Sequence, residues 1–167
     1  MSGVALNRAT LVLGFLGIFI AGYISLSHVL HISLPCGITH GCDIVQSHPT
    51  SYIVGNAADG GIPVAYVGVL GYLFLTILAI VRAMQGKPLS KPLVLIGFIA
   101  SAIGALYSGF LTYTALYVIK ATCVWCIASA LTMVVTTIVY AAMIQADAKA
   151  ASAATATLVT FIVVFLL

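Results

Sequence analysis

The sequence contains very little charge. Of its 167 residues only six are Lys or Arg and three are Asp or Glu, whereas 63% are hydrophobic. This composition excludes an ordinary soluble domain and is typical of an integral membrane protein embedded in a lipid bilayer. The few basic residues are scattered rather than clustered, which argues against a nucleic-acid-binding surface.

Several motifs that carry chemistry are also missing. The sequence has no haem-attachment motif, no glycine-rich nucleotide-binding pattern and no flavin fingerprint. No acidic residue interrupts the long apolar runs, which argues against a charged transport path. There is no internal repeat or low-complexity tract. Any chemistry is therefore expected from side chains outside these motifs.

The hydrophobic runs predict transmembrane helices. Four runs reach the roughly 20 apolar residues that cross a hydrocarbon layer of ~30 Å, and a fifth comes close. We expect all-α structure, in a single domain over residues 1–167, with helices at residues 10–30, 62–81, 93–117, 123–144 and 150–167. The first run is longer than the apolar core of a secretory signal peptide, so we expect it to be retained as a helix.

Basic residues predict the orientation. The segments before the first helix, between the second and third, and between the fourth and fifth carry Arg8, Arg82, Lys87, Lys91 and Lys149. The opposite side, which includes the outer loop 31–61, has only Lys120. Short loops that are rich in Lys and Arg stay in the cytoplasm. We therefore expect the amino terminus on the cytoplasmic side of the cell membrane. The opposite loops are expected on the outer side, in the compartment where disulfides persist.

All four cysteines lie on this predicted outer side. Cys36 and Cys42 form a spaced pair in the loop, and Cys123 and Cys126 form a close pair at a helix start. Residues three apart share one helix face, so the close pair can meet as a disulfide or a dithiol. The amino terminus of a helix favours a thiolate, and Lys120 in the preceding turn adds to that effect. These features predict a redox centre.

Three other roles for the sulfurs stay open. The close pair also suits two ligands of a structural zinc site, completed by the loop cysteines or a histidine. A disulfide of the loop pair could be purely structural, although this leaves the second pair unexplained. The sulfurs could also belong to a carrier or binder of soft metal ions such as Hg(II) or Cu(I). We favour a relay by thiol exchange, from a soluble dithiol protein to a membrane quinone, with no metal site.

The order of these motifs resembles the vitamin K epoxide reductase family. The resemblance rests on the loop pair, the sequence CDIVQS at residues 42–47, IPVAYVG at residues 62–68 and CVWC at residues 123–126. It covers about residues 10–145. It implies a four-helix bundle around a quinone, a fifth peripheral helix, and a short amphipathic segment in the outer loop that caps the site. The thiol oxidase DsbB has its cysteine pairs in reverse order and fits less well.

The resemblance implies a role for each cysteine. Cys36 would exchange with the partner protein, Cys42 would shuttle to Cys123, and Cys126 would face the quinone, either ubiquinone or menaquinone. Microbial family members reoxidise a thioredoxin-like protein that introduces disulfides into secreted proteins. Many relatives carry such a domain after the fifth helix. None follows here, so the expected partner is a separate thioredoxin-like (DsbA-like) protein.

Polar residues near the outer face are candidate quinone contacts. Many relatives place a serine six residues after the second loop cysteine, where this sequence has a histidine with a serine beside it. The candidates are Ser47, His48, Asn56, Tyr66, Tyr72 and Lys120. We interpret His28 as a solvated interfacial residue and Trp125 as part of an outer aromatic belt.

Overall fold

The computed structural model describes residues 3–30, 32–36, 41–55, 61–87 and 90–146. Its long elements are the helices α1 (Gly3–Leu30), α3 (Val64–Met84), α4 (Lys91–Tyr113) and α5 (Val124–Ala146), and α4 continues as the π-helical segment η4 (Thr114–Ile119). Within these ranges four helices are long and apolar enough to cross a membrane, which makes the chain a multi-pass membrane protein. The predicted fifth helix, 150–167, lies outside the described residues.

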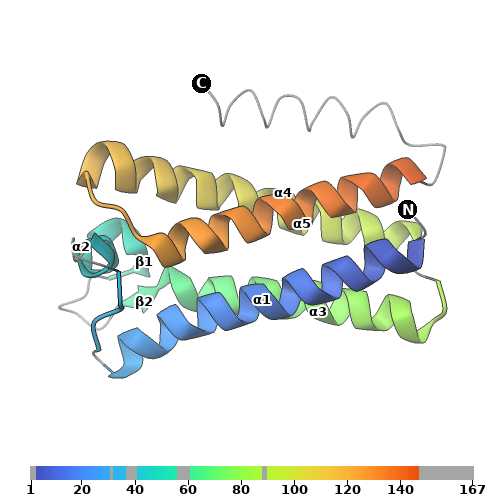
Figure 1. Ribbon diagram of the computed structural model, residues 1–167, viewed down its shortest axis with the longest axis horizontal. Coiled ribbons are helices and arrows are strands. Elements are labelled where there is room, and N and C mark those ends of the chain that lie inside the picture. Colours follow the sequence, from blue (N-terminus) through green and yellow to red (C-terminus); the bar gives the residue numbers. More distant parts are fainter. Residues whose placement is uncertain (1–2, 31, 37–40, 56–60, 88–89, 147–167) are drawn as a thin grey trace.

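The four long helices pack side by side as one bundle (Figure 1). Helix α1 packs against α3 and α5, and α4 packs against α5 and α3. Small residues allow the helices to approach closely. A Cβ atom at Gly17 of α1 would overlap the ring of Tyr72 on α3, and one at Gly97 of α4 would overlap the ring of Tyr140 on α5.

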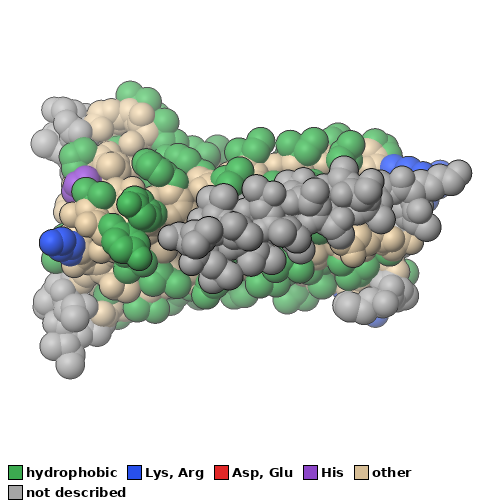
Figure 2. Space-filling view, turned by 90° about the horizontal axis from the view of Figure 1, so that it is seen from above, with side chains coloured by type: hydrophobic (Ala, Val, Ile, Leu, Met, Phe, Trp, Pro, Cys, Tyr) green, Lys and Arg blue, Asp and Glu red, His purple; other side chains and the backbone are tan. Residues whose placement is uncertain are grey.

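The outside of the bundle is apolar. Large hydrophobic side chains such as Phe15, Phe19 and Ile103 are more than half exposed. Figure 2 shows hydrophobic side chains along the length of the bundle, with Lys and Arg side chains at its two ends. A surface of this kind fits contact with lipid tails rather than with water.

One end of the bundle carries a small cap. Its elements are the helix α2 (Gly41–Ser47), the 3₁₀ turn η2 (Pro49–Ser51), and the strands β1 (Tyr52–Val54) and β2 (Ile62–Pro63), which pair antiparallel. The short segment that the resemblance implies in the outer loop is present as the helix α2. The two strands are not predicted, because runs of two or three residues carry no readable alternation.

At the opposite end the helices extend further than hydropathy predicts. Helix α1 begins at Gly3 rather than at residue 10, and α3 continues to Met84 rather than ending at residue 81. Some polar residues in these extra turns face the bundle interior, whereas Arg8 is exposed. Asn7 is buried, and its Nδ2 donates to the carbonyl of Ala79 over 3.1 Å.

The assignment of Arg82 to a cytoplasmic loop is wrong. Arg82 belongs to the last turn of α3 and is fully buried. Its guanidinium donates to Thr10 Oγ1 and to the Tyr140 hydroxyl, each over 3.2 Å, and lies 4.9 Å from the centre of the Tyr140 ring. A planar guanidinium can satisfy several acceptors at once, which allows this cation to join α1, α3 and α5 inside the bundle.

Candidate functional site

Both cysteine pairs lie at the capped end of the bundle, and both are disulfides. The Cα atoms are 5.8 Å apart in the Cys36–Cys42 bridge and 5.2 Å apart in the Cys123–Cys126 bridge. The sulfur atoms of Cys36, Cys42 and Cys123 all lie within 4.8 Å of one another. Cys42 and Cys123 are 0% and 1% exposed. Two residues from distant parts of the sequence therefore bring their sulfurs together in a buried contact between the pairs.

Close backbone packing brings the two pairs together. Gly41, the first residue of α2, lies directly against the backbone of Thr122, which precedes the helix cysteines. A second link comes from Trp125, whose Nε1 donates to the carbonyl of Pro35 over 3.3 Å and whose ring lies 4.7 Å from that of Tyr23. Trp125 thus packs between α1 and the Cys36 segment, rather than serving only the predicted aromatic belt.

The start of α5 places Cys123 in a polar backbone environment. The chain leaves η4 through Lys120, which adopts a left-handed conformation with φ of 56°. The helix then begins at Val124, immediately after Cys123. The backbone N–H of Cys126 donates to Cys123 Sγ over 3.2 Å. A hydrogen bond to this sulfur stabilises negative charge on it, as the sequence predicts for a helix start.

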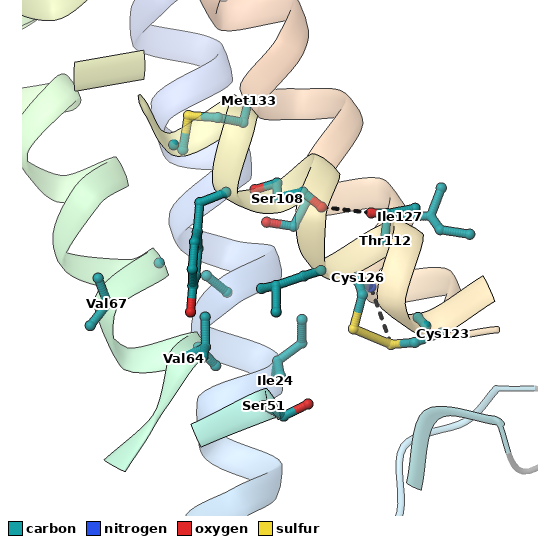
Figure 3. Close-up of a pocket in the computed structure, with 18 of the residues that line it drawn as sticks. Ile24, Ser51, Val64, Val67, Ser108, Thr112, Cys123, Cys126, Ile127 and Met133 are labelled. Carbon is teal, nitrogen blue, oxygen red and sulfur yellow. Dashed lines mark hydrogen bonds between the residues drawn. A yellow bond between two sulfur atoms is a disulfide. The ribbon is translucent and has the colours of Figure 1, made fainter. Parts of the chain in front are cut away.

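A cavity of about 330 Å³ lies inside the bundle beside the second disulfide. Residues of α1, α3, α4 and α5 form its walls, α2 and η2 contribute at the capped end, and both Cys123 and Cys126 reach it (Figure 3). Most of its lining is apolar, including Ile24, Val64 and Met133. An apolar cavity with a few polar groups is typical of a site for an apolar ring compound.

Tyr72 is a buried polar group on this wall. It is 1% exposed, and its hydroxyl donates to the carbonyl of Ser129 over 2.7 Å and lies 3.2 Å from the Ser129 hydroxyl. Ser129 is one turn after Cys126 on the same helix and also lines the cavity. Tyr72 of α3 is therefore hydrogen-bonded to α5, the helix that carries Cys126.

Of the six predicted quinone contacts, Tyr72 lines the cavity. The side chains of Ser47, His48, Tyr66 and Lys120 are not part of the lining among the described residues. The Ser47 hydroxyl donates to the carbonyl of Ile44 over 3.2 Å, and His48 caps η2 through its contact with Thr50. Asn56 lies outside the described residues.

Two residues that are not among the predicted quinone contacts also line the cavity. His28 Nδ1 lies 2.9 Å from the carbonyl of Ile24, which can only accept, so Nδ1 is the donor of this hydrogen bond. Gln46 lies on α2, and its side-chain nitrogen is buried. Within the described ranges neither His28 Nε2 nor Gln46 Nε2 has a hydrogen-bond partner.

Comparison with known proteins adds a family. The model of the vitamin K epoxide reductase family matches residues 8–141, a range that contains all four cysteines and the cavity. A search of curated proteins found no match.

Proposed function

The chain belongs to the vitamin K epoxide reductase family, whose members are quinone reductases acting on disulfides, and from this premise we propose its substrates and electron path. The donor is a separate thioredoxin-like (DsbA-like) protein, and the acceptor is ubiquinone or menaquinone. The chain thereby supports disulfide formation in secreted proteins. The cysteines face the outer side of the cell membrane and the amino terminus faces the cytoplasm, in line with the basic residues Arg8, Lys87 and Lys91 at the other end.

One observation carries the proposal. The sulfurs of Cys42 and Cys123 lie within 4.8 Å of each other, and the disulfide that contains Cys123 borders an apolar cavity. Thiol exchange requires a thiolate to reach a disulfide sulfur, and quinone reduction requires a dithiol beside the ring. The same four residues meet both requirements.

The relay passes two electrons from the donor dithiol to the quinone. The donor dithiol reduces the Cys36–Cys42 disulfide and leaves as a disulfide. The Cys42 thiolate then attacks Cys123, forming a Cys42–Cys123 bond and releasing Cys126 as a thiolate. Cys36 attacks Cys42, restores the first disulfide and releases Cys123, whose negative charge the N–H of Cys126 stabilises. The Cys123–Cys126 dithiol passes two electrons and two protons to the quinone and becomes a disulfide again.

The cavity suits the acceptor. A quinone head is a flat apolar ring with two carbonyl oxygens, and the cavity offers apolar walls with hydroxyl and amide groups at separate points. We propose that Tyr72 contacts the ring on the α3 side and that Cys126 faces it from α5. The other predicted contacts, Ser47, His48, Asn56, Tyr66 and Lys120, stay predictions.

A quinone reduction assay tests the proposal. Reduced thioredoxin-like protein serves as donor, and quinol formation is compared between the unmodified protein and its Cys36→Ala, Cys42→Ala, Cys123→Ala and Cys126→Ala variants. Turnover is expected to disappear in all four variants, because each of them lacks one sulfur of the two disulfides. Val124→Ala, an exposed position between the helix cysteines, is the control that retains turnover. Turnover that survives without Cys123 or Cys126, or its absence with both quinones, would overturn the proposal.

A further inference from the structure

Three sulfurs at the capped end are clustered closely enough to form a metal site once the disulfides are reduced. Cys36, Cys42 and Cys123 each offer one sulfur, all within 4.8 Å of one another. Zinc–sulfur bonds of about 2.3 Å place the sulfurs of a tetrahedral site about 3.8 Å apart. Among the residues that the structure describes, this is the single group of three or more His, Cys, Asp or Glu side chains with such spacing. We infer that the fully reduced protein binds one thiophilic cation of the zinc class through these three thiolates.

Binding requires both disulfides to be reduced. In the oxidised protein each of the three sulfurs is bonded to another sulfur, and no thiolate is present. Reduction takes two electrons for each disulfide, supplied by excess dithiol or phosphine. The freed sulfurs then separate to a non-bonded distance, which moves them toward the spacing of a zinc site. Three thiols lose three protons as the cation binds, giving a site with a net charge of −1.

The surroundings favour a tightly held ion. Cys42 and Cys123 are buried, so water competes poorly for the cation. The N–H of Cys126 donates to Cys123 Sγ, and this hydrogen bond stabilises the anionic ligand. The link from Trp125 to Pro35 holds the Cys36 segment near the start of α5. The fourth position is open to Cys126, which lies beside Cys123, or to water.

This site would also block electron transfer. The metal occupies the sulfurs of Cys42 and Cys123, which must bond to each other in the relay. This consequence rests on the proposed function, whereas metal binding itself does not. Quinone limits metal binding, because it keeps the Cys123–Cys126 pair oxidised. The site therefore forms when reductant is in excess and acceptor is scarce.

Cadmium is the probe for the site. The protein is reduced anaerobically with a phosphine, freed of reductant and titrated with Cd²⁺, while the sulfur-to-cadmium charge-transfer absorption is recorded. We expect one Cd²⁺ per reduced chain, displacement by Zn²⁺, and no charge-transfer band for the oxidised protein. Cys36→Ser, Cys42→Ser and Cys123→Ser should each weaken binding by about 100-fold or more, whereas the control Val124→Ala should not change it.

The outcomes separate this inference from its alternatives. Retention of Cd²⁺ by Cys36→Ser would place the ion on sulfurs other than that of Cys36 and overturn the proposed three-sulfur site. Equal binding by the oxidised protein, or no binding by the reduced protein, would overturn it as well. The comparison of oxidised with reduced protein needs no variant, so misfolding of a variant cannot obscure it. Quinone reduction without added metal is measured on the same preparation, so active protein that fails to bind Cd²⁺ would refute the metal site alone.

Discussion

Replacement of Gly41 by Ala should slow electron transfer between the two cysteine pairs. A Cβ atom at this position would lie closer to the Thr122 carbonyl oxygen than the 3.0 Å that real Cβ atoms keep, and 3.1 Å from the Thr122 nitrogen. Both neighbours are backbone atoms, which cannot rotate away as a side chain can. The overlap is therefore relieved only if α2 moves away from the segment before α5.

The size of the effect follows from the position of Cys42, the next residue in the chain. A shift of α2 on the order of 1 Å moves its sulfur away from Cys123, and a misplacement of that size can reduce the rate of a reaction by about 100-fold. We expect Gly41→Ala to slow the exchange between Cys42 and Cys123 by about 10- to 100-fold. Overpacking should also lower the free energy of unfolding by about 1–3 kcal/mol.

Rapid-quench thiol labelling can measure this step directly. Donor protein is mixed with oxidised enzyme and quinone, the reaction is stopped with a maleimide, and the labelled cysteines are identified by mass. Reduction of the Cys36–Cys42 disulfide should stay fast in Gly41→Ala, whereas labelling of Cys126 and quinol formation should be delayed. Gly22→Ala is the matched control, because a Cβ atom there meets no other atom within 4 Å. Equal rates in Gly41→Ala and the control would refute the reasoning.

Three further changes probe the bundle and the cavity. Arg82→Ala should lower the free energy of unfolding by about 2–4 kcal/mol, because it leaves a buried cavity and removes the donor to the Tyr140 hydroxyl. Thermal unfolding in detergent measures this loss, and an unchanged midpoint would contradict it. Tyr72→Phe should raise the KM for quinone by about 3- to 10-fold in steady-state kinetics, while the rate at which the donor reduces the first disulfide stays unchanged. An equal slowing of that donor reaction would count against a quinone contact. Gln46→Leu removes a buried side-chain nitrogen that has no partner, together with the long 3.4 Å hydrogen bond from Ser27 to the Gln46 oxygen, and should stabilise the quinone-free protein by about 1 kcal/mol. It should weaken quinone binding if the amide contacts the ring. Thermal unfolding with and without quinone measures both effects, and destabilisation of the quinone-free protein would refute the first part.

Hydropathy predicts the four-helix bundle but not the helix ends opposite the cap. Apolar runs of about 20 residues identify the four long helices, since the bilayer selects for length and apolarity. The same criterion leaves Asn7 and Arg82 outside the predicted helices, although both belong to helices and are buried in the bundle. A buried guanidinium is tolerated because Thr10 and Tyr140 supply its acceptors. These acceptors lie on α1 and α5, far from Arg82 in sequence, so a window along one segment cannot detect them.

The predictability of the site depends on how far each feature extends along the chain. The helix pair is local, because Cys126 is the third residue after Cys123 and helical geometry brings the two together. The cavity is not local, because its walls come from four helices. Helical phase would nevertheless have identified Gln46, which lies four residues after Cys42 on α2 and therefore on the same face. Counting along the chain by analogy with relatives selects His48 and its neighbour Ser47 instead. One residue further along a helix is a rotation of about 100°, and Ser47 is accordingly exposed, with its hydroxyl bonded to its own helix. The face that carries Cys42 is thus the better guide to the residues that line the cavity than the position in a family motif.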